Sequence, residues 1–403
     1  MILAVWGKSL AYVCFLTLLL RGVTGKYNKN TRKSLPAMPK LITQHGYPAE
    51  THTVATDDGY ILTMHRIPYS PLSNSTDTAR PVVFLQHGLI SSSVDWVIMG
   101  PGNGLGYLLA DAGYDVWMGN ARGNMYSTRH NKLSAMLPTF WSFSWHEMGV
   151  YDLPAEIDYI LTNTTQKSLR YVGHSMGTTM FYVLMSKKPE YNAKISRMIA
   201  LAPVAFLRNT KSPFASITKL VPSGVLFDMV SNWPFFPNKK FSNGLLEAFC
   251  KRGTITQKMC TNTLFQIGGF NSNQLNQTML PTILHYFPAG SSMKAWRHYG
   301  QLISSGSFRE YDYGFANIFK YGNLYPPDYN FAVIITFVSL IVGPNDWLAS
   351  PEDASLLHRK LPNSEYHEIA LPEFNHFDFL WAIDVKTLVN DKVLSLLEVD
   401  QDY

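Results

Sequence analysis

The spacing of hydrophobic residues changes repeatedly along the chain, and from residue 81 onwards strand-like and helix-like spacings alternate. Short apolar runs typical of buried strands alternate with longer segments in which apolar residues recur at helical spacing. The pattern predicts strands at 60–67, 82–85, 114–118, 169–172, 198–201, 331–342 and 365–370, and helices at 104–112, 148–162, 173–188, 351–360 and 385–398. Because strands that alternate with helices form βαβ units, we expect an α/β fold with a mostly parallel central sheet flanked by helices.

This alternation stops after residue 203 and returns at residue 330. Residues 204–329 are rich in Phe, Pro, Asn and Ser and show short helical patches without a clear strand pattern. We therefore predict one core domain made of residues 26–203 and 330–403, with residues 204–329 as a largely helical cap or lid inserted over the sheet. An insertion of this kind accounts for a chain of 403 residues, two to three times the common domain size.

The first 25 residues have the layout of a secretory signal peptide. Lys8 precedes an apolar run at 10–20, and small residues at 23–25 supply a cleavage point. The run is shorter than the roughly 17–25 residues of a membrane span. We therefore expect residues 1–25 to be removed, no transmembrane anchor, and a mature protein in the secretory pathway.

The cysteines and the glycosylation motifs are consistent with passage through the secretory pathway. Cys250 and Cys260 remain after cleavage, and in an oxidising compartment they either close one small loop or stay as two free, half-buried thiols. Three Asn-x-Ser/Thr motifs begin at Asn74, Asn163 and Asn276, and we expect glycosylation there. Short motifs of this kind arise by chance, so their weight comes from their agreement with the signal peptide.

The composition favours a large apolar core and argues against two classes of protein. Apolar residues make up 46% of the chain and charged residues 16%, which excludes wholesale disorder. The formal net charge of +5 falls to +3 once Lys8 and Arg21 leave with the signal peptide. So small and dispersed a charge argues against nucleic acid as a partner. The 13% of aromatic residues and the 16 methionines point instead to large apolar surfaces, in the core or around an apolar ligand.

The sharpest chemical motif is Gly-His-Ser-Met-Gly at 173–177, directly after the strand predicted at 169–172. A serine between two such glycines at a strand-to-helix junction is typical of a nucleophile elbow. The turn is tight, so side chains two positions on either side of Ser175 would collide with the neighbouring strand and helix. The motif predicts that Ser175 is a nucleophile; the alternative is an ordinary strand-to-helix turn.

A serine hydroxyl becomes a good nucleophile when a histidine removes its proton and an acid orients that histidine. In folds with such an elbow the chain order is serine, acid, histidine. Asp346 follows the apolar strand predicted at 331–342, and His376 lies in a loop between a predicted strand and a predicted helix. We predict that these two residues complete the catalytic group. The competing residues lie in or beside predicted helices and strands: His358, His367, Asp353 and Asp378.

The reaction also needs two backbone N–H groups that face the developing oxyanion. One is expected from Met176, the residue after the nucleophile, and the other from Leu89 in the loop after the first core strand. Gly88 allows the backbone to turn inward there. His87-Gly88 also fits a plain strand-ending turn.

We expect no metal ion and no cofactor. Two His-Glu pairs begin a zinc-protease pattern, but neither has a second histidine four residues further on. A glycine-rich segment at 102–106 lacks the spacing of a dinucleotide-binding loop.

Several longer stretches resemble one known family. They are 57–62, 85–89, 109–120, 152–155, 173–179, 268–271 and 345–348. In these residues the chain is similar to the acid lipases of the α/β-hydrolase fold, the family of gastric and lysosomal lipases, and the similarity extends over almost all of the mature chain. The resemblance implies hydrolysis of triacylglycerols or cholesteryl esters, with Ser175, Asp346 and His376 as the triad.

The resemblance also implies a cap domain with a lid and a cap disulfide between Cys250 and Cys260. It implies a neutral lipid at a lipid–water interface as the substrate, in the lysosome or outside the cell, and we expect a monomer. Two alternatives remain open: a soluble carboxylesterase for short acyl chains, and a lipid-binding protein of this fold without activity.

Overall fold

The computed structural model describes residues 37–72, 80–213, 232–236, 261 and 264–398. The predicted signal peptide at 1–25, the sequon at Asn74, and both Cys250 and Cys260 lie outside these residues. The same holds for much of the segment assigned to the cap.

Within the described residues, nine strands form one sheet and two short strands form a second. The strands are β1 (Glu50–Ala55), β2 (Tyr60–Ile67), β3 (Val82–Gln86), β4 (Asp115–Met118), β5 (Arg129–His130), β6 (Leu169–His174), β7 (Ile195–Leu201), β8 (Pro234–Phe235), β9 (Ser291–Ser292), β10 (Phe337–Val342) and β11 (Ser364–Glu368). The large sheet has the order β1-β2-β4-β3-β6-β7-β10-β11, and β5 pairs with β2. The pairs from β4 to β11 are parallel, whereas β1, β2 and β5 pair in an antiparallel manner.

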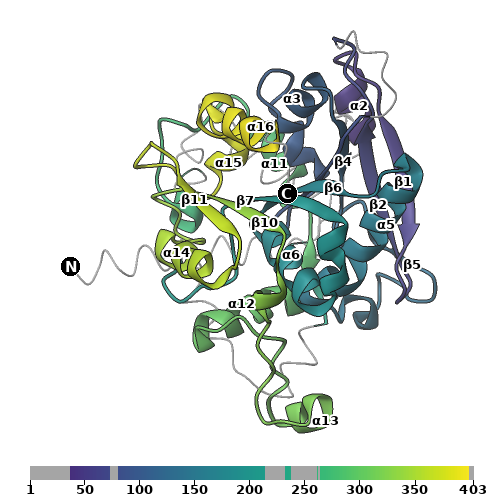
Figure 1. The fold of residues 1–403 in the computed structure, drawn as a ribbon, viewed down its shortest axis with the longest axis vertical. Coiled ribbons are helices and arrows are strands. Elements are labelled where there is room, and N and C mark those ends of the chain that lie inside the picture. The colour runs from purple at the N-terminus through teal and green to yellow at the C-terminus, as the bar shows by residue number, and fades with distance from the viewer. Residues whose placement is uncertain (1–36, 73–79, 214–231, 237–260, 262–263, 399–403) are drawn as a thin grey trace, which may run out of the picture.

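Helices cover both faces of this sheet (Figure 1). The α-helices are α2 (Met38–Thr43), α3 (Leu105–Asp111), α4 (Trp145–Glu147), α5 (Leu153–Thr164), α6 (Met176–Lys187), α11 (Leu280–Tyr286), α12 (Met293–Ser305), α13 (Asn317–Tyr321), α14 (Pro351–Lys360), α15 (Asp378–Trp381) and α16 (Asp391–Glu398). Short 3₁₀ helices are η1 (Ser93–Trp96), η2 (Pro138–Trp141), η4 (Pro189–Ala193), η5 (Gly314–Ala316) and η6 (Phe331–Val333), and π-helical turns are η3 (Met148–Asp152) and η7 (Lys386–Asn390).

The predicted order of strands and helices in the core is confirmed. Every residue of β3 is buried, and all but one residue of β10, as expected for parallel strands covered on both faces. The chain passes from β3 to β4 on one side and from β6 to β7 on the other, so the strand order reverses at β3 and β6. Ligands of open α/β sheets bind outside the carboxyl ends of the strands at such a point.

One predicted strand is shorter than expected. The apolar run at 331–342 begins with the 3₁₀ helix η6, and the strand itself starts at Phe337. The Asn330 side chain accepts the N–H of Ala332 at 2.9 Å and starts that helix. Asn192 Oδ1 then accepts the N–H groups of Ile335 and Thr336 at 3.0 and 2.9 Å. These side chains bind the backbone groups that a longer strand would have used in the sheet.

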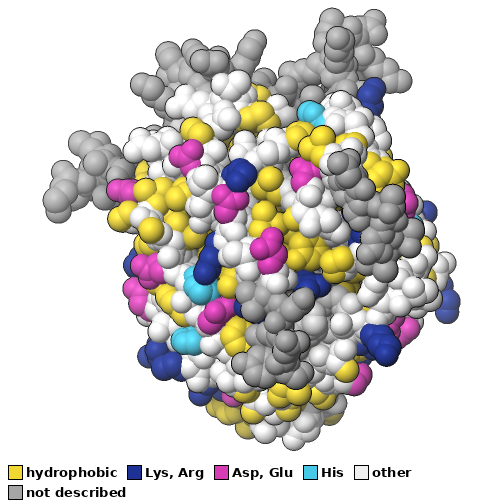
Figure 2. Space-filling view, turned by 45° about the horizontal axis from the view of Figure 1, so that its top comes forward, with side chains coloured by type: hydrophobic (Ala, Val, Ile, Leu, Met, Phe, Trp, Pro, Cys, Tyr) yellow, Lys and Arg dark blue, Asp and Glu magenta, His cyan; other side chains and the backbone are white. Residues whose placement is uncertain are grey.

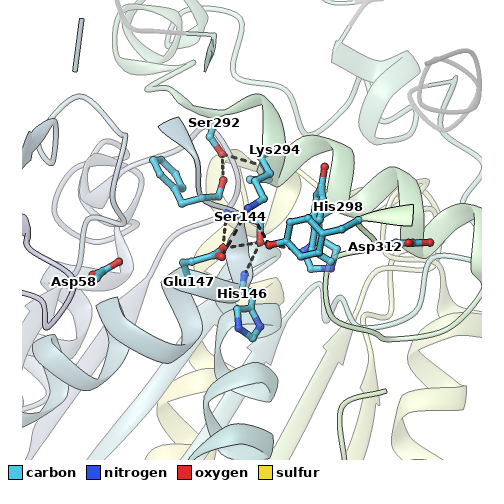
Figure 3. A network of polar contacts seen from close by, with 12 residues as sticks. Asp58, Ser144, His146, Glu147, Ser292, Lys294, His298 and Asp312 are labelled. Carbon is cyan, nitrogen blue, oxygen red and sulfur yellow. Dashed lines mark hydrogen bonds and ion pairs between the residues drawn. The ribbon is translucent and has the colours of Figure 1, made fainter. Parts of the chain in front are cut away.

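A polar network joins α12 to α4 (Figure 3). Ser144 and Glu147 form a capping box at the start of α4, and His298 Nδ1 lies 3.1 Å from Ser144 Oγ. The buried Lys294 places its Nζ 3.9 Å from Glu147 Oε1. A cavity of about 110 Å³ lies beside the network. Because a buried charge without its partner is costly, this pair holds α12 in one place on the core.

The surface carries charges of both signs. On the face shown in Figure 2, basic and acidic side chains are scattered among hydrophobic ones over the described part of the chain. Among the helices of the described part, none has the length and apolar character that a membrane crossing requires.

Candidate active site

Ser175 lies at the sharp junction between β6 and α6. Its backbone has φ 51° and ψ −114°, a region that residues other than glycine rarely adopt. The strained peptide is held on both sides: Ser175 N–H donates to the Leu201 carbonyl at 3.0 Å, and the Ser175 carbonyl accepts Thr178 N–H at 2.9 Å. A conformation of this kind costs on the order of 1–3 kcal/mol and persists where the surroundings enforce it.

Both flanking glycines are required by close contacts. A Cβ on Gly173 would lie 2.8 Å from the backbone of Gly177, and a Cβ on Gly177 would lie 2.3 Å from the Gln86 carbonyl oxygen in β3. The first contact is with the start of the following helix and the second is with the neighbouring strand. The physical reason expected from the motif is therefore present in the structure.

The structure brings the side chains of Ser175, His376 and Asp346 into one hydrogen-bonded chain. Ser175 Oγ lies 3.0 Å from His376 Nε2, and His376 Nδ1 lies 2.7 Å from Asp346 Oδ2. Because a carboxylate only accepts, Nδ1 carries the imidazole proton and Nε2 is free to accept the serine proton. The side chains of His376 and Asp346 are almost fully buried.

Asp346 follows β10 in a turn that fixes both of its oxygens. Oδ1 accepts the N–H groups of Leu348 and Ala349, each at 2.8 Å, which leaves Oδ2 for His376. These contacts hold the carboxylate in one orientation, with Oδ2 facing the imidazole.

The loop after β3 lies directly against the serine. β3 and β6 are neighbours in the sheet with Gln86 opposite Gly173, so their carboxyl ends are level. A Cβ on Gly88 would lie 3.2 Å from the Cβ of Ser175. Among the described residues, no hydrogen-bond acceptor faces the N–H of Leu89 or of Met176. Two unused donors thus remain beside Ser175, one in the loop after β3 and one at the first residue of α6.

His87 has a role that the sequence did not reveal. Its Nε2 accepts the Ala121 N–H at 3.1 Å, so Nδ1 carries the proton and donates to the Gly88 carbonyl at 2.7 Å. Burial lowers the pKa of His87 to about 4, which keeps the ring neutral in this tautomer. Because a peptide is planar and trans, fixing the Gly88 carbonyl also fixes the direction of the Leu89 N–H.

A second neutral histidine lies beside His376. His174 is buried, and its Nε2 donates to the His376 carbonyl at 3.2 Å. Burial, together with the nearby His376, holds the pKa of His174 well below its usual range. A neutral ring can pack here without repelling a positive charge on His376.

Two buried carboxyl groups, one in η1 and one in α15, have raised pKa values. Burial raises the pKa of Asp95 in η1 to about 8, and Ser91 Oγ is its hydrogen-bond partner. Burial also raises the pKa of Asp378 to about 7, although the N–H of Asn375 and the amide of Asn271 favour its ionised form. In the folded protein these groups keep protons that the unfolded chain releases near pH 4.

We expect Asp95 to make the folded protein less stable as the pH rises from 5 to 8. The folded state then holds one proton more than the unfolded state, so the free energy of unfolding falls by up to about 1.4 kcal/mol per pH unit. The measurement is urea unfolding of the wild type and of Asp95→Asn at several pH values. The buried histidines titrate in both proteins, so their effects on the free energy of unfolding cancel. The difference between the two slopes of this free energy against pH is therefore due to Asp95. The exposed Asp57→Asn is the control, and an Asp95→Asn slope equal to that of the wild type would contradict the assignment.

The remaining predicted residues are dispersed. Asn163 is exposed at the end of α5, and Asn276 is half-buried in the turn before α11. The four competing residues lie in α14, β11 and α15, as expected, and Asp378 alone among them lies close to the triad. In the part of the chain that is described, no three His, Cys, Asp or Glu side chains are grouped so that they could hold a metal ion.

Comparison with known proteins gives the family. The chain matches the partial alpha/beta-hydrolase lipase region over residues 38–100 and the alpha/beta hydrolase fold over residues 81–383. It is 43% identical to Lipase 3 of Drosophila melanogaster, in an alignment that covers 89% of this chain and 91% of the relative. It is 40% identical to the gastric triacylglycerol lipase of Homo sapiens and 37% identical to the lysosomal acid lipase/cholesteryl ester hydrolase of Homo sapiens. Both of these alignments cover 94% of this chain and 95% of the relative.

Solved structures agree on the fold. A soluble variant of monoglyceride lipase from Saccharomyces cerevisiae, in complex with a substrate analog, matches with a TM-score of 0.56 at 15% identity. The match covers 92% of this chain and 98% of that chain. Together with the relatives, which are similar over nearly their full length, these matches show that the chain belongs to the acid lipase family of the α/β-hydrolase fold.

Proposed function

We propose that this lipase hydrolyses carboxylic ester bonds of neutral lipids with Ser175 as nucleophile, His376 as general base and acid, and Asp346 as the residue that orients the histidine. The observation that carries the proposal is the hydrogen-bonded chain from Ser175 Oγ through His376 to Asp346 Oδ2. Its two short contacts supply the geometry in which a serine is activated by a neighbouring base.

The reaction starts with proton transfer from Ser175 to His376 Nε2 as Oγ attacks the ester carbonyl carbon. The carbonyl oxygen becomes an oxyanion, and the unused N–H groups of Leu89 and Met176 stabilise it. Each such donor is worth about two to three orders of magnitude in rate. The amino terminus of α6 adds a favourable field for the same negative charge.

The tetrahedral intermediate then collapses and the alcohol leaves with the proton from His376. An ester between the acyl group and Ser175 remains. His376 next removes a proton from a water molecule, whose oxygen attacks the acyl carbon through the same oxyanion site. The carboxylic acid is released and Ser175 recovers its proton.

Neutral lipid esters are the proposed substrates. The relatives named above are a triacylglycerol lipase and a cholesteryl ester hydrolase, and both are similar to this chain over nearly its whole length. We propose that residues 204–329, which include α11, α12 and α13, form the cap through which such a substrate reaches Ser175 from a lipid surface.

The protein is proposed to act in the secretory pathway, outside the cell or in the lysosome. The signal-peptide pattern and the exposed sequon at Asn163 support this location. A single chain carries all three side chains of the triad, so the proposed reaction needs no second subunit and fits a monomer.

A hydrolysis panel tests the proposal. Purified protein is assayed on emulsified triolein, emulsified cholesteryl oleate and a dissolved short-chain ester at acidic and neutral pH, and a fluorophosphonate probe is mapped by mass spectrometry. We expect turnover of at least one emulsified ester and probe attached to Ser175. Turnover of the dissolved ester alone would indicate a carboxylesterase, and an unlabelled Ser175 would indicate a lipid-binding protein without activity.

A further inference from the structure

The segment 268–275, which the sequence pattern placed in the cap, runs beside the polypeptide that follows His376. Gln274 Nε2 donates to Asp384 Oδ2 at 2.9 Å, and its Oε1 accepts the Asp384 N–H at 3.0 Å. The Gln274 carbonyl accepts the Ile383 N–H at 3.0 Å. Three hydrogen bonds at one residue therefore fasten this segment to the chain that carries the histidine.

A second link is made by a single carbonyl group at the other end of the segment. Gly268 ends a helical turn at 264–268, and its oxygen accepts two N–H groups, from Trp347 at 3.1 Å and from His376 at 3.2 Å. Trp347 directly follows Asp346. One oxygen with two lone pairs thus joins the loop of the acid to the loop of the base.

This contact requires glycine at two consecutive positions. A Cβ on Gly268 would lie 2.6 Å from the ring of Phe377, the residue after the histidine. Gly269 has φ +116°, and a Cβ there would lie 2.1 Å from the Asn345 carbonyl oxygen, one residue before the acid. The Asn345 carbonyl cannot yield without moving a loop of the site, since it is backbone and the Asn345 N–H is bound to the Phe374 carbonyl at 3.0 Å.

Side-chain amides extend the same junction. The buried Asn271 donates to Asp378 Oδ2 at 2.8 Å, and that oxygen also accepts the Asn375 N–H at 2.8 Å. In the opposite direction, Asn345 Nδ2 donates to the Phe270 carbonyl at 2.9 Å. Residues 268, 270 and 271 are therefore hydrogen-bonded to the residues on both sides of the proposed acid, to the backbone of the proposed base and to Asp378.

We propose that residues 268–271 position His376 relative to Asp346, so that the part of the cap segment nearest the core is a structural component of the catalytic centre. The inference rests on the proposed roles of Ser175, His376 and Asp346. Reacting groups displaced by about 1 Å can lose on the order of 100-fold in rate. The backbone at 268–271 touches no reacting atom, and it acts through the two loops that it holds.

Gly269→Ala tests the proposal, because the new methyl group displaces the Asn345–Asp346 turn. We expect kcat for the water-soluble ester p-nitrophenyl butyrate to fall by about 100-fold with little change in KM. The rate of fluorophosphonate labelling at Ser175 should fall by a similar factor, since labelling needs the same activated serine. The low-field proton NMR signal of the histidine N–H bound to the aspartate should shift or disappear.

The matched control is Gly322→Ala. Gly322 also has a positive φ, +68°, at the end of a helix in the same cap segment, but a Cβ there meets nothing within 4 Å. We expect this variant to keep the kcat, the labelling rate and the low-field signal of the wild type.

A second pair of variants covers the case in which Gly269→Ala does not fold. Asn271→Ala should lower kcat by about 10-fold, whereas Asn317→Ala, which removes another buried cap asparagine bound to Asp312, should leave it unchanged.

The outcomes separate this inference from the proposed function. Wild-type kcat on the soluble ester in folded Gly269→Ala and Asn271→Ala would overturn the positioning role. A loss on emulsified triolein alone would also overturn it, because it would assign these residues to the lipid surface. If the wild type itself carried no probe at Ser175, the proposed function would fail first.

Discussion

Replacing Ser175 by alanine is expected to lower kcat for ester hydrolysis by about 10⁶-fold, because the remaining groups have no nucleophile to activate. The change removes one oxygen and leaves the backbone strain at this position as it is, so the folded structure should persist. The measurement is kcat on p-nitrophenyl butyrate and on emulsified triolein, with circular dichroism to verify the fold.

Ser339→Ala is the matched control for this experiment. Ser339 is a fully buried serine in β10 whose hydroxyl contacts Arg197 and Glu365 rather than the triad. It should keep wild-type turnover with a modest loss of stability. A Ser175→Ala protein that retained near wild-type activity would refute the assignment of the nucleophile.

Asp346→Asn is expected to lower kcat by about 10⁴-fold while the protein stays folded. The asparagine oxygen can still accept the N–H groups of Leu348 and Ala349, which turns its NH₂ group toward His376 Nδ1. The imidazole must then carry its proton on Nε2, where it can no longer accept the proton of Ser175. The loss therefore comes from the wrong tautomer rather than from a displaced ring.

The control for this variant is Asp353→Asn. Asp353 is equally buried, and its carboxylate binds the backbone and side chain of Asn209 at 2.8 and 2.9 Å. We expect it to lower the urea midpoint without changing kcat. Equal kcat values for Asp346→Asn and the wild type would place the orienting acid elsewhere, and Asp378, which lies close to the triad, would be the next candidate.

Most of the core elements could be predicted because their patterns are local. β2 and α14 have the predicted bounds, and β3, β4, β6 and β7 differ from prediction by one to three residues. Periods of apolar residues reflect which face of an element is covered, and this holds before any partner is known. The prediction failed at 331–336, where Asn192, distant in sequence, binds the backbone so that the strand starts only at Phe337.

The candidate triad shows the same difference between what local patterns predict and what contacts between distant segments decide. Its three residues could be named from their places after strands, since the carboxyl ends of parallel strands meet at one edge of a sheet. The distances of 2.7 and 3.0 Å, however, depend on supports that no local pattern reveals. The Gly268 carbonyl reaches both loops from the cap segment, and His87 sets the Gly88 carbonyl through a loop that follows β4.

The sequence by itself therefore determined the order of strands and helices, the family, and which serine, aspartate and histidine to consider, because each depends on residue type and short-range spacing. The tertiary structure alone decided which tautomer His376 adopts, which carboxyls keep a proton, and what holds the acid and base loops together. These properties depend on burial and on hydrogen bonds between segments far apart in the chain, which arise once the chain has folded.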